Sequence, residues 1–344
     1  MRVEPDDPTG DWTREGVFEV DSGVYRIPLP LPHDGLRAVN VYAICDSSGV
    51  VLIDSGWPIA ADRDRLERAL AALDCGLGDI RKFLITHVHR DHYTLAVALR
   101  REFGGEIALG AGEQPTIARL NDPDHRPMIE HAAAMARHGA DELAAWIRER
   151  ADQIRINPGD WEPPDVWLEE TDVPLGERTL QALPTPGHTQ GHVVFIEDAA
   201  GLLFAGDHVL PHITPSIGFE AAPAELPLAN YLRSLNLVRS LPDRKLLPAH
   251  GPVQPTVHAR VDELLEHHAR RLDECAAIVG GDCLTPYQVA RQMTWTRRQR
   301  AFADLDEFNQ ILAVIETAAH LDVLVTQDRL RRQEVDGVRR YSAA

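Results

Sequence analysis

Residues 86–96, with the sequence THVHRDHYTLA, place three histidines and an aspartate within six positions directly after an apolar run. His87 and His89 are two residues apart, so on an extended segment both side chains point to one side and can bind one ion. Asp91 and His92 follow where a helix is expected to begin and could serve a second ion. A lone His-x-His is as well explained by a polar loop. Four ligand-type groups together behind an apolar strand instead predict a metal site.

The bulk composition sets limits on the class of protein. A chain of 344 residues with 44% hydrophobic content is long enough for more than one domain, and we expect two. A net charge of −18 disfavours nucleic acid and anionic membrane surfaces as partners. The N-terminal segment is acidic and has no apolar signal region, and no stretch approaches the roughly 18 uninterrupted apolar residues of a membrane span. These features predict a cytoplasmic protein with no membrane partner.

The elements expected before residue 255 alternate between strands and helices. β-branched runs bounded by turn residues predict strands at 17–27, 38–45 and 50–53, which would open an antiparallel sheet. Further on we expect a helix at 58–74, a strand at 82–86, a helix from about 94, a helical insert at about 113–150, strands at 179–183, 193–197 and 202–205, a helix at 228–241 and a strand at 245–249.

The pattern changes after residue 255. A long amphipathic helix is expected at 257–279, a second helix after Thr285, and a third at about 304–325. Asp336 and Gly337 lie between two short runs and predict a hairpin. Three helices and a hairpin predict a small winged-helix-like domain at 256–344, following a catalytic domain at 1–255.

Three more ligand-type residues each follow an expected strand. His188 lies in PTPGHTQGH (184–192), Asp207 in FAGDH (204–208) and His250 in PAHGP (248–252). Because residues that follow the ends of neighbouring strands can meet at one edge of a sheet, all of these side chains can converge there.

This series of motifs resembles the metallo-β-lactamase superfamily, of the glyoxalase II-like or lactamase-B-like kind, over about residues 17–255. The resemblance implies an α/β fold, a four-layer αββα sandwich. It also implies a ligand set in which one metal is held by His87, His89 and His188, the other by Asp91, His92 and His250, with Asp207 bridging them. Asp54, in the strand-ending Asp-x-Gly of LIDSG (52–56), would orient a metal-binding histidine from behind. His192 and His208, beside ligands but off the ligand pattern, are expected either to support the ligands from behind or to be structural.

The expected donors define the chemistry. Five imidazoles and two carboxylates without a thiolate fit two Zn²⁺ ions, although iron or manganese remains compatible. Two metals can lower the pKa of a shared water from 15.7 to about 7 and so supply hydroxide at neutral pH. Asp91 could also carry a proton to the leaving group. The sequence therefore predicts a binuclear hydrolase of a small ester, thioester or lactone, with an acyl thioester favoured.

Substrate contacts are less well defined by the sequence. Tyr93 and Thr94 follow His92 where the family usually has a glycine two positions on. Thr94 could cap the new helix, and Tyr93 could face the substrate. The segments around 113–150 and 211–219 lie between ligands in the sequence, so their apolar residues either line an acyl channel or pack ordinarily: Met128, Met135, Trp146, Ile213, Ile217 and Phe219.

Other functions stay open. The C-terminal part resembles winged-helix domains appended to some hydrolases of this fold, including endoribonuclease-like members. However, its third helix carries acids and no arginine or lysine before residue 329, which disfavours nucleic acid. The five-arginine hairpin is expected to be solvated or to form a homo-oligomer contact. A mononuclear iron dioxygenase and a nonenzymatic regulator are further alternatives. The remaining histidines, including His267 and His268, are expected on the surface.

Overall fold

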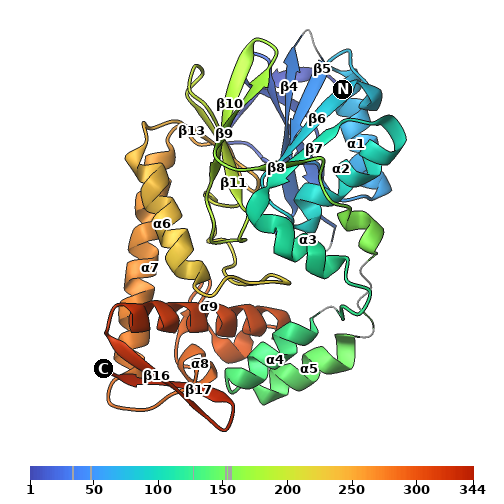
Figure 1. Cartoon of the computed structure of the whole chain (residues 1–344). Coiled ribbons are helices and arrows are strands. Elements are labelled where there is room, and N and C mark those ends of the chain that lie inside the picture. Colours follow the sequence, from blue (N-terminus) through green and yellow to red (C-terminus); the bar gives the residue numbers. More distant parts are fainter. Residues whose placement is uncertain (33–34, 47–48, 127, 152, 154–156) are drawn as a thin grey trace.

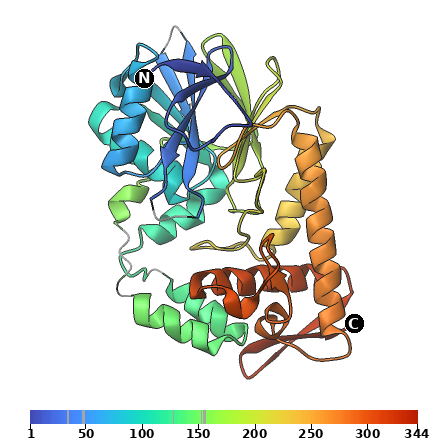
Figure 2. The same ribbon diagram turned by 180° about the vertical axis from the view of Figure 1, so that it is seen from behind.

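The computed structural model describes residues 1–32, 35–46, 49–126, 128–151, 153 and 157–344, and its described strands form two large sheets (Figure 1, Figure 2). The first sheet follows chain order: β1 (Val3–Pro5), β2 (Val17–Asp21), β3 (Val24–Pro30), β4 (Ala38–Asp46), β5 (Gly49–Ile53), β6 (Ile80–Ile85), β7 (Glu106–Gly110) and β8 (Val166–Leu168). The second has the order β13 (Lys245–Pro248), β12 (Leu202–Gly206), β11 (Val193–Glu197), β10 (Arg178–Pro184) and β9 (Thr171–Leu175). Strands β2 to β5 pair antiparallel, as predicted.

The two sheets pack face to face because their strands alternate apolar residues on both faces. In β5, Val51 joins the core between the sheets and Leu52 joins the core on the outer side. In β12, Phe204 joins the core between the sheets and Leu203 joins the core on the outer side of the second sheet. Strands that are buried on both faces require a layer of helices outside each sheet.

Helices supply those outer layers. The first sheet is covered by α1 (Ala60–Ala71), α2 (Arg90–Phe103) and α3 (Gln114–Leu120), whose apolar residues belong to the same core cluster as its strands. The second sheet is covered by α6 (Pro227–Ser240) and α7 (Val257–Val279). The result is an αββα sandwich with mixed sheets, as the resemblance implied. The helical insert expected at about 113–150 contains α3 and also α4 (Ile129–Arg137) and α5 (Asp141–Ala151), and these last two helices contact α9 (Glu307–Thr326).

The C-terminal elements also match the expected pattern. Helices α7, α8 (Pro286–Ala290) and α9 are present, and β16 (Leu330–Val335) pairs with β17 (Val338–Ala343) across Asp336 and Gly337. A short extra pair, β14 (Thr294–Trp295) and β15 (Arg300–Ala301), was not expected. One apolar cluster runs from the second sheet through α7 to α9. The winged-helix assignment and the domain boundary at residue 255 stay predictions.

Helix α9 is apolar because it is a core helix. Among the described helices it alone is long and apolar enough to cross a membrane by length and composition. However, 67% of its most apolar window is buried inside the protein. Its apolar residues therefore serve packing against α7, α8 and the insert.

Several local predictions were wrong. The expected strand at 17–27 is a hairpin that turns at Gly23, where φ is +69°. Helix α2 begins at Arg90 rather than near Thr94, and the Thr94 hydroxyl donates to the Arg90 carbonyl instead of capping the helix. Histidine burial was also misjudged, since His268 and His320 are each only 1% exposed. Periodicity alone did not reveal that α7 and α9 bury histidines against each other.

Candidate metal centre

The structure brings all seven expected ligands to one edge of the sandwich. Each follows the end of a strand: His87 and His89 follow β6, Asp91 and His92 occupy the first turn of α2, His188 follows β10, Asp207 follows β12 and His250 follows β13. Strands β5 and β6 run parallel, as do β12 and β13, so these carboxyl ends face the same way. Tertiary pairing of the two sheets therefore assembles groups that are more than 160 residues apart in the chain.

The first set of nitrogens converges on His89. Its Nδ1 lies 3.0 Å from His87 Nε2 and 3.0 Å from His188 Nε2. These three residues form one of the groups whose ligand atoms all lie within 4.8 Å of one another. They are the three histidines expected at one metal.

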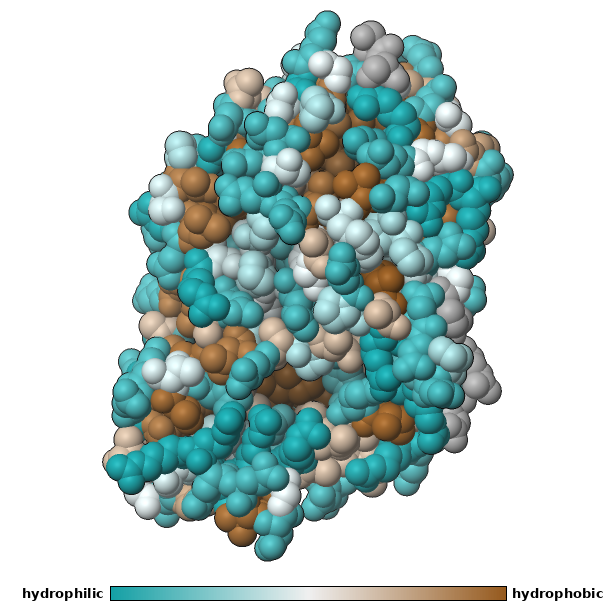
Figure 3. All heavy atoms as spheres, in the orientation of Figure 1, coloured by the Kyte–Doolittle hydropathy of each residue, from teal (hydrophilic) through white to brown (hydrophobic). Residues whose placement is uncertain are grey.

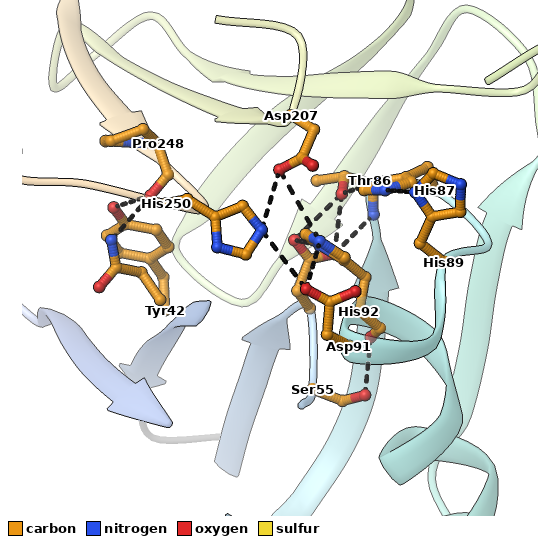
Figure 4. A network of polar contacts seen from close by, with 12 residues as sticks. Tyr42, Ser55, Thr86, His87, His89, Asp91, His92, Asp207, Pro248 and His250 are labelled. Atoms are coloured by element: carbon orange, nitrogen blue, oxygen red, sulfur yellow. Dashed lines mark hydrogen bonds and ion pairs between the residues drawn. The ribbon is translucent and has the colours of Figure 1, made fainter. Parts of the chain in front are cut away.

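The second set lies around two carboxylates (Figure 4). His250 Nε2 is 3.4 Å from Asp91 Oδ2 and 3.3 Å from Asp207 Oδ1, and His92 Nε2 is 3.4 Å from the same Asp91 oxygen. The other Asp207 oxygen, Oδ2, lies 3.4 Å from His188 Nε2. Asp207 thus presents one oxygen to each set, which is the arrangement that a bridging ligand requires.

Hydrogen bonds behind the histidines fix which nitrogen faces inward. The Nδ1 of His188 donates to the Ser216 carbonyl at 2.7 Å, and the Nδ1 of His250 donates to the Ala38 carbonyl at 2.7 Å. Because a neutral imidazole has one N–H, each Nε2 is left with a lone pair that points into the cluster. Metal-binding histidines usually carry such a partner on the outer nitrogen.

Asp54 fixes two further histidines from beneath the cluster. Its Oδ2 accepts from His92 Nδ1 at 2.8 Å, and its Oδ1 accepts from the Thr86 backbone N–H at 2.8 Å. The Thr86 hydroxyl donates to the same carboxylate at 3.0 Å, so it can accept from His87 Nδ1, also at 3.0 Å. Both His87 and His92 therefore present Nε2 to the cluster. Thr86 was missed by sequence analysis, although it directly precedes the motif.

The donor set fits divalent metal ions. Four buried inward atoms have no hydrogen-bond partner among the described residues: Asp91 Oδ2, His92 Nε2, Asp207 Oδ1 and His250 Nε2. Leaving buried polar atoms unpaired costs about 1–3 kcal/mol each, more when charged. Cations coordinated by these lone pairs would remove that cost.

The pKa shifts show which of these groups carry charge before a cation binds. Burial, together with neighbouring His188, lowers the pKa of His89 to about 3. Burial would raise the pKa of Asp91, but His92 and His250 outweigh it, so the pKa falls well below its usual range. Burial alone would likewise lower the pKa of His92, but Asp91 and Asp54 outweigh it and raise that pKa. The carboxylates are therefore ionised, and without a metal ion they favour a proton on His92, which a bound cation would displace.

Replacing Asp54 with asparagine tests the support behind the ligands. Asp54 has φ of +62°, a conformation that asparagine tolerates, so Asp54→Asn should keep the backbone. It replaces the charge that orients His92, and we expect zinc affinity and turnover to fall by about 10- to 100-fold. The matched control is Asp62→Asn. Asp62 is also buried and accepts a backbone N–H, from Trp57, without a hydrogen bond to any of the seven residues. Equal zinc affinity in both variants, measured by calorimetric titration, would contradict this role.

The structure does not bring every expected residue to the site. Tyr93 is fully buried among core residues, and its hydroxyl donates to the Glu162 carbonyl at 2.5 Å. Ile213 is 42% exposed and lies outside the two cavities described below. His192 accepts from the Asp207 backbone N–H at 3.2 Å, which helps to hold that carboxylate in place.

A cavity of about 240 Å³ opens beside His89. Its walls include Leu120, Met128, Trp161 and Phe219, so Met128 and Phe219 lie where an acyl channel was expected. Met135 instead belongs to the core cluster, with Trp146 packed against that cluster. A second cavity of about 390 Å³ shares His131 and Ala221 with the first and is also lined by α9, and Figure 3 shows a hollow with an apolar floor at the level of that helix.

His131, a polar residue that lines both cavities, was not predicted from the sequence. His131 is 9% exposed, and both of its ring nitrogens are buried without a hydrogen-bond partner among the described residues. Burial lowers its pKa to about 4, so the ring is neutral at pH 7. Its ring packs on Phe219 at 4.5 Å between centroids. The sequence carried no signal for this residue beyond its place in the insert.

Comparisons with known proteins agree with this geometry. The family model described as the metallo-beta-lactamase superfamily matches residues 34–250. A probable metallo-hydrolase, YqjP of Bacillus subtilis, is 23% identical over 89% of this chain and 92% of its own length. The crystal structure of the metallo-beta-lactamase family protein TTHA1429 from Thermus thermophilus is 27% identical with a TM-score of 0.78, and the match covers 95% of this chain and 100% of that one. An atrochrysone carboxyl ACP thioesterase, AgnL7 of Paecilomyces divaricatus, is 25% identical over 70% of this chain and 59% of its own length.

Proposed function

Because the chain belongs to the metallo-beta-lactamase superfamily of metal-binding hydrolases, we propose that it uses two bound divalent metal ions, zinc by preference, to hydrolyse a small carboxylic ester, thioester or lactone. An acyl thioester is the favoured substrate. The observation that carries this choice is the mostly apolar cavity that opens at His89. Such a cavity suits an acyl group whose carbonyl carbon reaches the metal ligands. The similarity to AgnL7, a named thioesterase, supports the same class.

The residues of the site would have different roles in hydrolysis. When bound, two divalent cations supply a nucleophilic water at neutral pH, because they lower the pKa of a shared water from 15.7 to about 7. Asp207 holds its two oxygens toward the two histidine sets. Asp91 Oδ2 faces the interior, has no hydrogen-bond donor among the described residues, and can take up a proton and pass it to the departing sulfur or oxygen.

His131 gives the acyl cavity one polar contact. A neutral imidazole with both nitrogens free can donate one hydrogen bond and accept another. An acyl group with a carbonyl or hydroxyl beyond the reacting carbon would satisfy the ring, whereas a plain alkyl chain would leave it unpaired. The cavity therefore favours an acyl group that carries a carbonyl or hydroxyl over one with a plain alkyl chain.

A substrate panel on zinc-loaded protein tests the proposed reaction. We expect kcat/KM to be highest for acyl thioesters, lower for lactones and aryl esters, and negligible for phosphodiesters. Activity confined to RNA or phosphodiesters would overturn the assignment. Full activity with a single iron ion per chain, accompanied by consumption of oxygen, would also overturn the assignment. The protein would then be a dioxygenase and not a hydrolase.

Filling the cavity tests where the acyl group binds. Ala221 lines both cavities, so Ala221→Phe adds bulk to the cavity beside His89 without replacing any of the seven expected ligands. We expect kcat/KM for a long acyl thioester to fall at least about tenfold while that for an acetyl thioester changes little, since one lost apolar contact is worth about 1–3 kcal/mol. Ala224→Phe is the control, because Ala224 lines the outer cavity alone. Equal losses for both chain lengths would place the acyl group elsewhere.

A further inference from the structure

A second cluster of histidines lies where α7 contacts α9, apart from the seven ligands. His267 and His268 come from α7, and Glu316 and His320 are one helical turn apart on α9. The ligand atoms of His267, His268 and Glu316 all lie within 4.8 Å of one another. The rings of His267 and His268 are 5.1 Å apart and nearly perpendicular, so the two nitrogens approach from different directions.

A chain of hydrogen bonds fixes the proton positions in this cluster. The Nδ1 of His320 donates to the Glu316 backbone carbonyl at 2.8 Å, because a carbonyl can only accept. The Nε2 of neutral His320 is then an acceptor, and His268 Nδ1 must donate to it across 3.1 Å. His268 Nε2 therefore carries a lone pair and no proton. This is the arrangement of a metal-binding histidine whose outer nitrogen is held by a second group.

The lone pair of His268 has no partner in the described part of the chain. His268 is 1% exposed, and its Nε2 is buried without a hydrogen bond. The Tyr231 ring packs against His268 at 5.5 Å, but the Tyr231 hydroxyl already donates to the His208 carbonyl. A buried acceptor without a donor is costly, so an ion at this position would recover free energy.

The charges near the cluster allow a cation. Burial lowers the pKa of His267, and the positive charges of three nearby arginines lower it further: Arg260, Arg270 and Arg271. Each is paired with a glutamate of α7, at 2.7 Å for Arg260 with Glu263, 2.9 Å for Arg270 with Glu266 and 2.9 Å for Arg271 with Glu274. Arg271 also lies over the Trp295 ring at 4.5 Å.

Glu316 has no ion pair among the described residues, and burial raises its pKa. Burial lowers the pKa of His320 to about 3, so the metal-free cluster holds neutral imidazoles beside a carboxyl that is hard to ionise. A bound cation would favour the ionised carboxylate, and metal binding would release its proton. His267 and Glu316 are half-buried, which leaves the cluster open to ions from solvent.

We propose that His267, His268 and Glu316 form an additional divalent metal site that joins α7 to α9. Two imidazoles and one carboxylate are a donor set that zinc accepts, with the fourth position left to water. The ion stabilises the packing of the C-terminal helices and takes no part in hydrolysis. Its binding adds stability in proportion to the logarithm of free metal concentration.

Zinc titration of full-length protein tests this site without relying on the hydrolase assignment. The background is His89→Ala/His250→Ala, which removes one ligand from each of the two proposed catalytic sets. In that background we expect a zinc ion that is bound at the helix cluster, and its affinity should drop at least about 100-fold when Glu316→Gln or His267→Ala is added. The melting temperature should rise with zinc in the background and stay constant in both triple variants.

The control is His212→Ala, which removes an exposed histidine far from this cluster in the sequence and should leave the titration unchanged. Glu316 and His267 are partly exposed, so the triple variants should fold, which melting without zinc verifies. Zinc binding that is equal in the background and in both triple variants would overturn the proposal. A background protein whose melting temperature does not respond to zinc would also overturn it.

Discussion

Asp207→Ala is expected to reduce kcat/KM for the preferred substrate by roughly 10³- to 10⁴-fold, equivalent to about 4–5.5 kcal/mol. Asp207 presents Oδ1 to His250 and Oδ2 to His188, so its loss removes the one group that faces both ligand sets. Without a shared anion, two dications at short separation repel strongly, and we expect the metal content of the variant to drop as well. Steady-state kinetics and elemental analysis on the same sample measure both effects.

Asp172→Ala is the control for this variant. Asp172 is exposed on β9, the edge strand of the same sheet, and its register partner on β10 is Gln181, seven positions before His188. Its turnover and metal content should match those of the unmodified protein. Circular dichroism should show that Asp207→Ala keeps the sandwich, because the side chain lies in a loop beyond β12 and outside the apolar cores. Turnover within tenfold of normal in folded Asp207→Ala would contradict its place between the metals.

The second large effect is expected from Gly191→Ala. Gly191 lies between His188 and the β11 strand, where its loop presses against the segment that follows β7. A Cβ at this position would lie 2.2 Å from the Glu113 backbone nitrogen and 2.6 Å from the Gly112 carbonyl carbon. Both neighbours are backbone atoms and cannot rotate away. We expect the free energy of unfolding to decrease by about 3 kcal/mol or more, because relief requires a shift of the backbone.

Urea denaturation of metal-free protein measures this loss without interference from bound ions. Gly281→Ala is the control, since a Cβ there meets no atom within 4 Å. Its midpoint should differ little from that of the unmodified protein. A midpoint for Gly191→Ala equal to that of Gly281→Ala would show that the loop does not pack closely against Gly112 and Glu113.

The convergence of the seven expected ligands could be predicted from sequence because their motifs stand after strand ends, whereas their assignment to two metals came from the resemblance. His87, His188, Asp207 and His250 all follow short apolar runs, and a strand end is where a side chain leaves the core and becomes available for chemistry. The αββα architecture itself came from the resemblance, because alternation within one strand does not reveal which sheet it joins. The hairpin at Asp336 and Gly337 was predictable from local turn chemistry alone.

The parts that escaped prediction depend on tertiary contacts. Strands β7, β8 and β9 are only three to five residues long, and β9 contains Pro174, so their pattern is weak. Tyr93 resembled a substrate contact in the sequence, but the turn of α2 directs it into the core, where it reaches the Glu162 carbonyl. His131 and His268 are polar residues on helices whose burial is decided by neighbours distant in the chain.

Anomalous diffraction from crystals of zinc-loaded protein would show whether the seven clustered residues hold two metal ions. We expect two strong peaks at the seven-residue cluster, one contacted by His87, His89 and His188, the other by Asp91, His92 and His250, with Asp207 reaching both. The peaks should lie about 3.5–4 Å apart, as in other two-metal sites. A map with zinc bound elsewhere and no peak among these side chains would show that these residues do not form a metal centre.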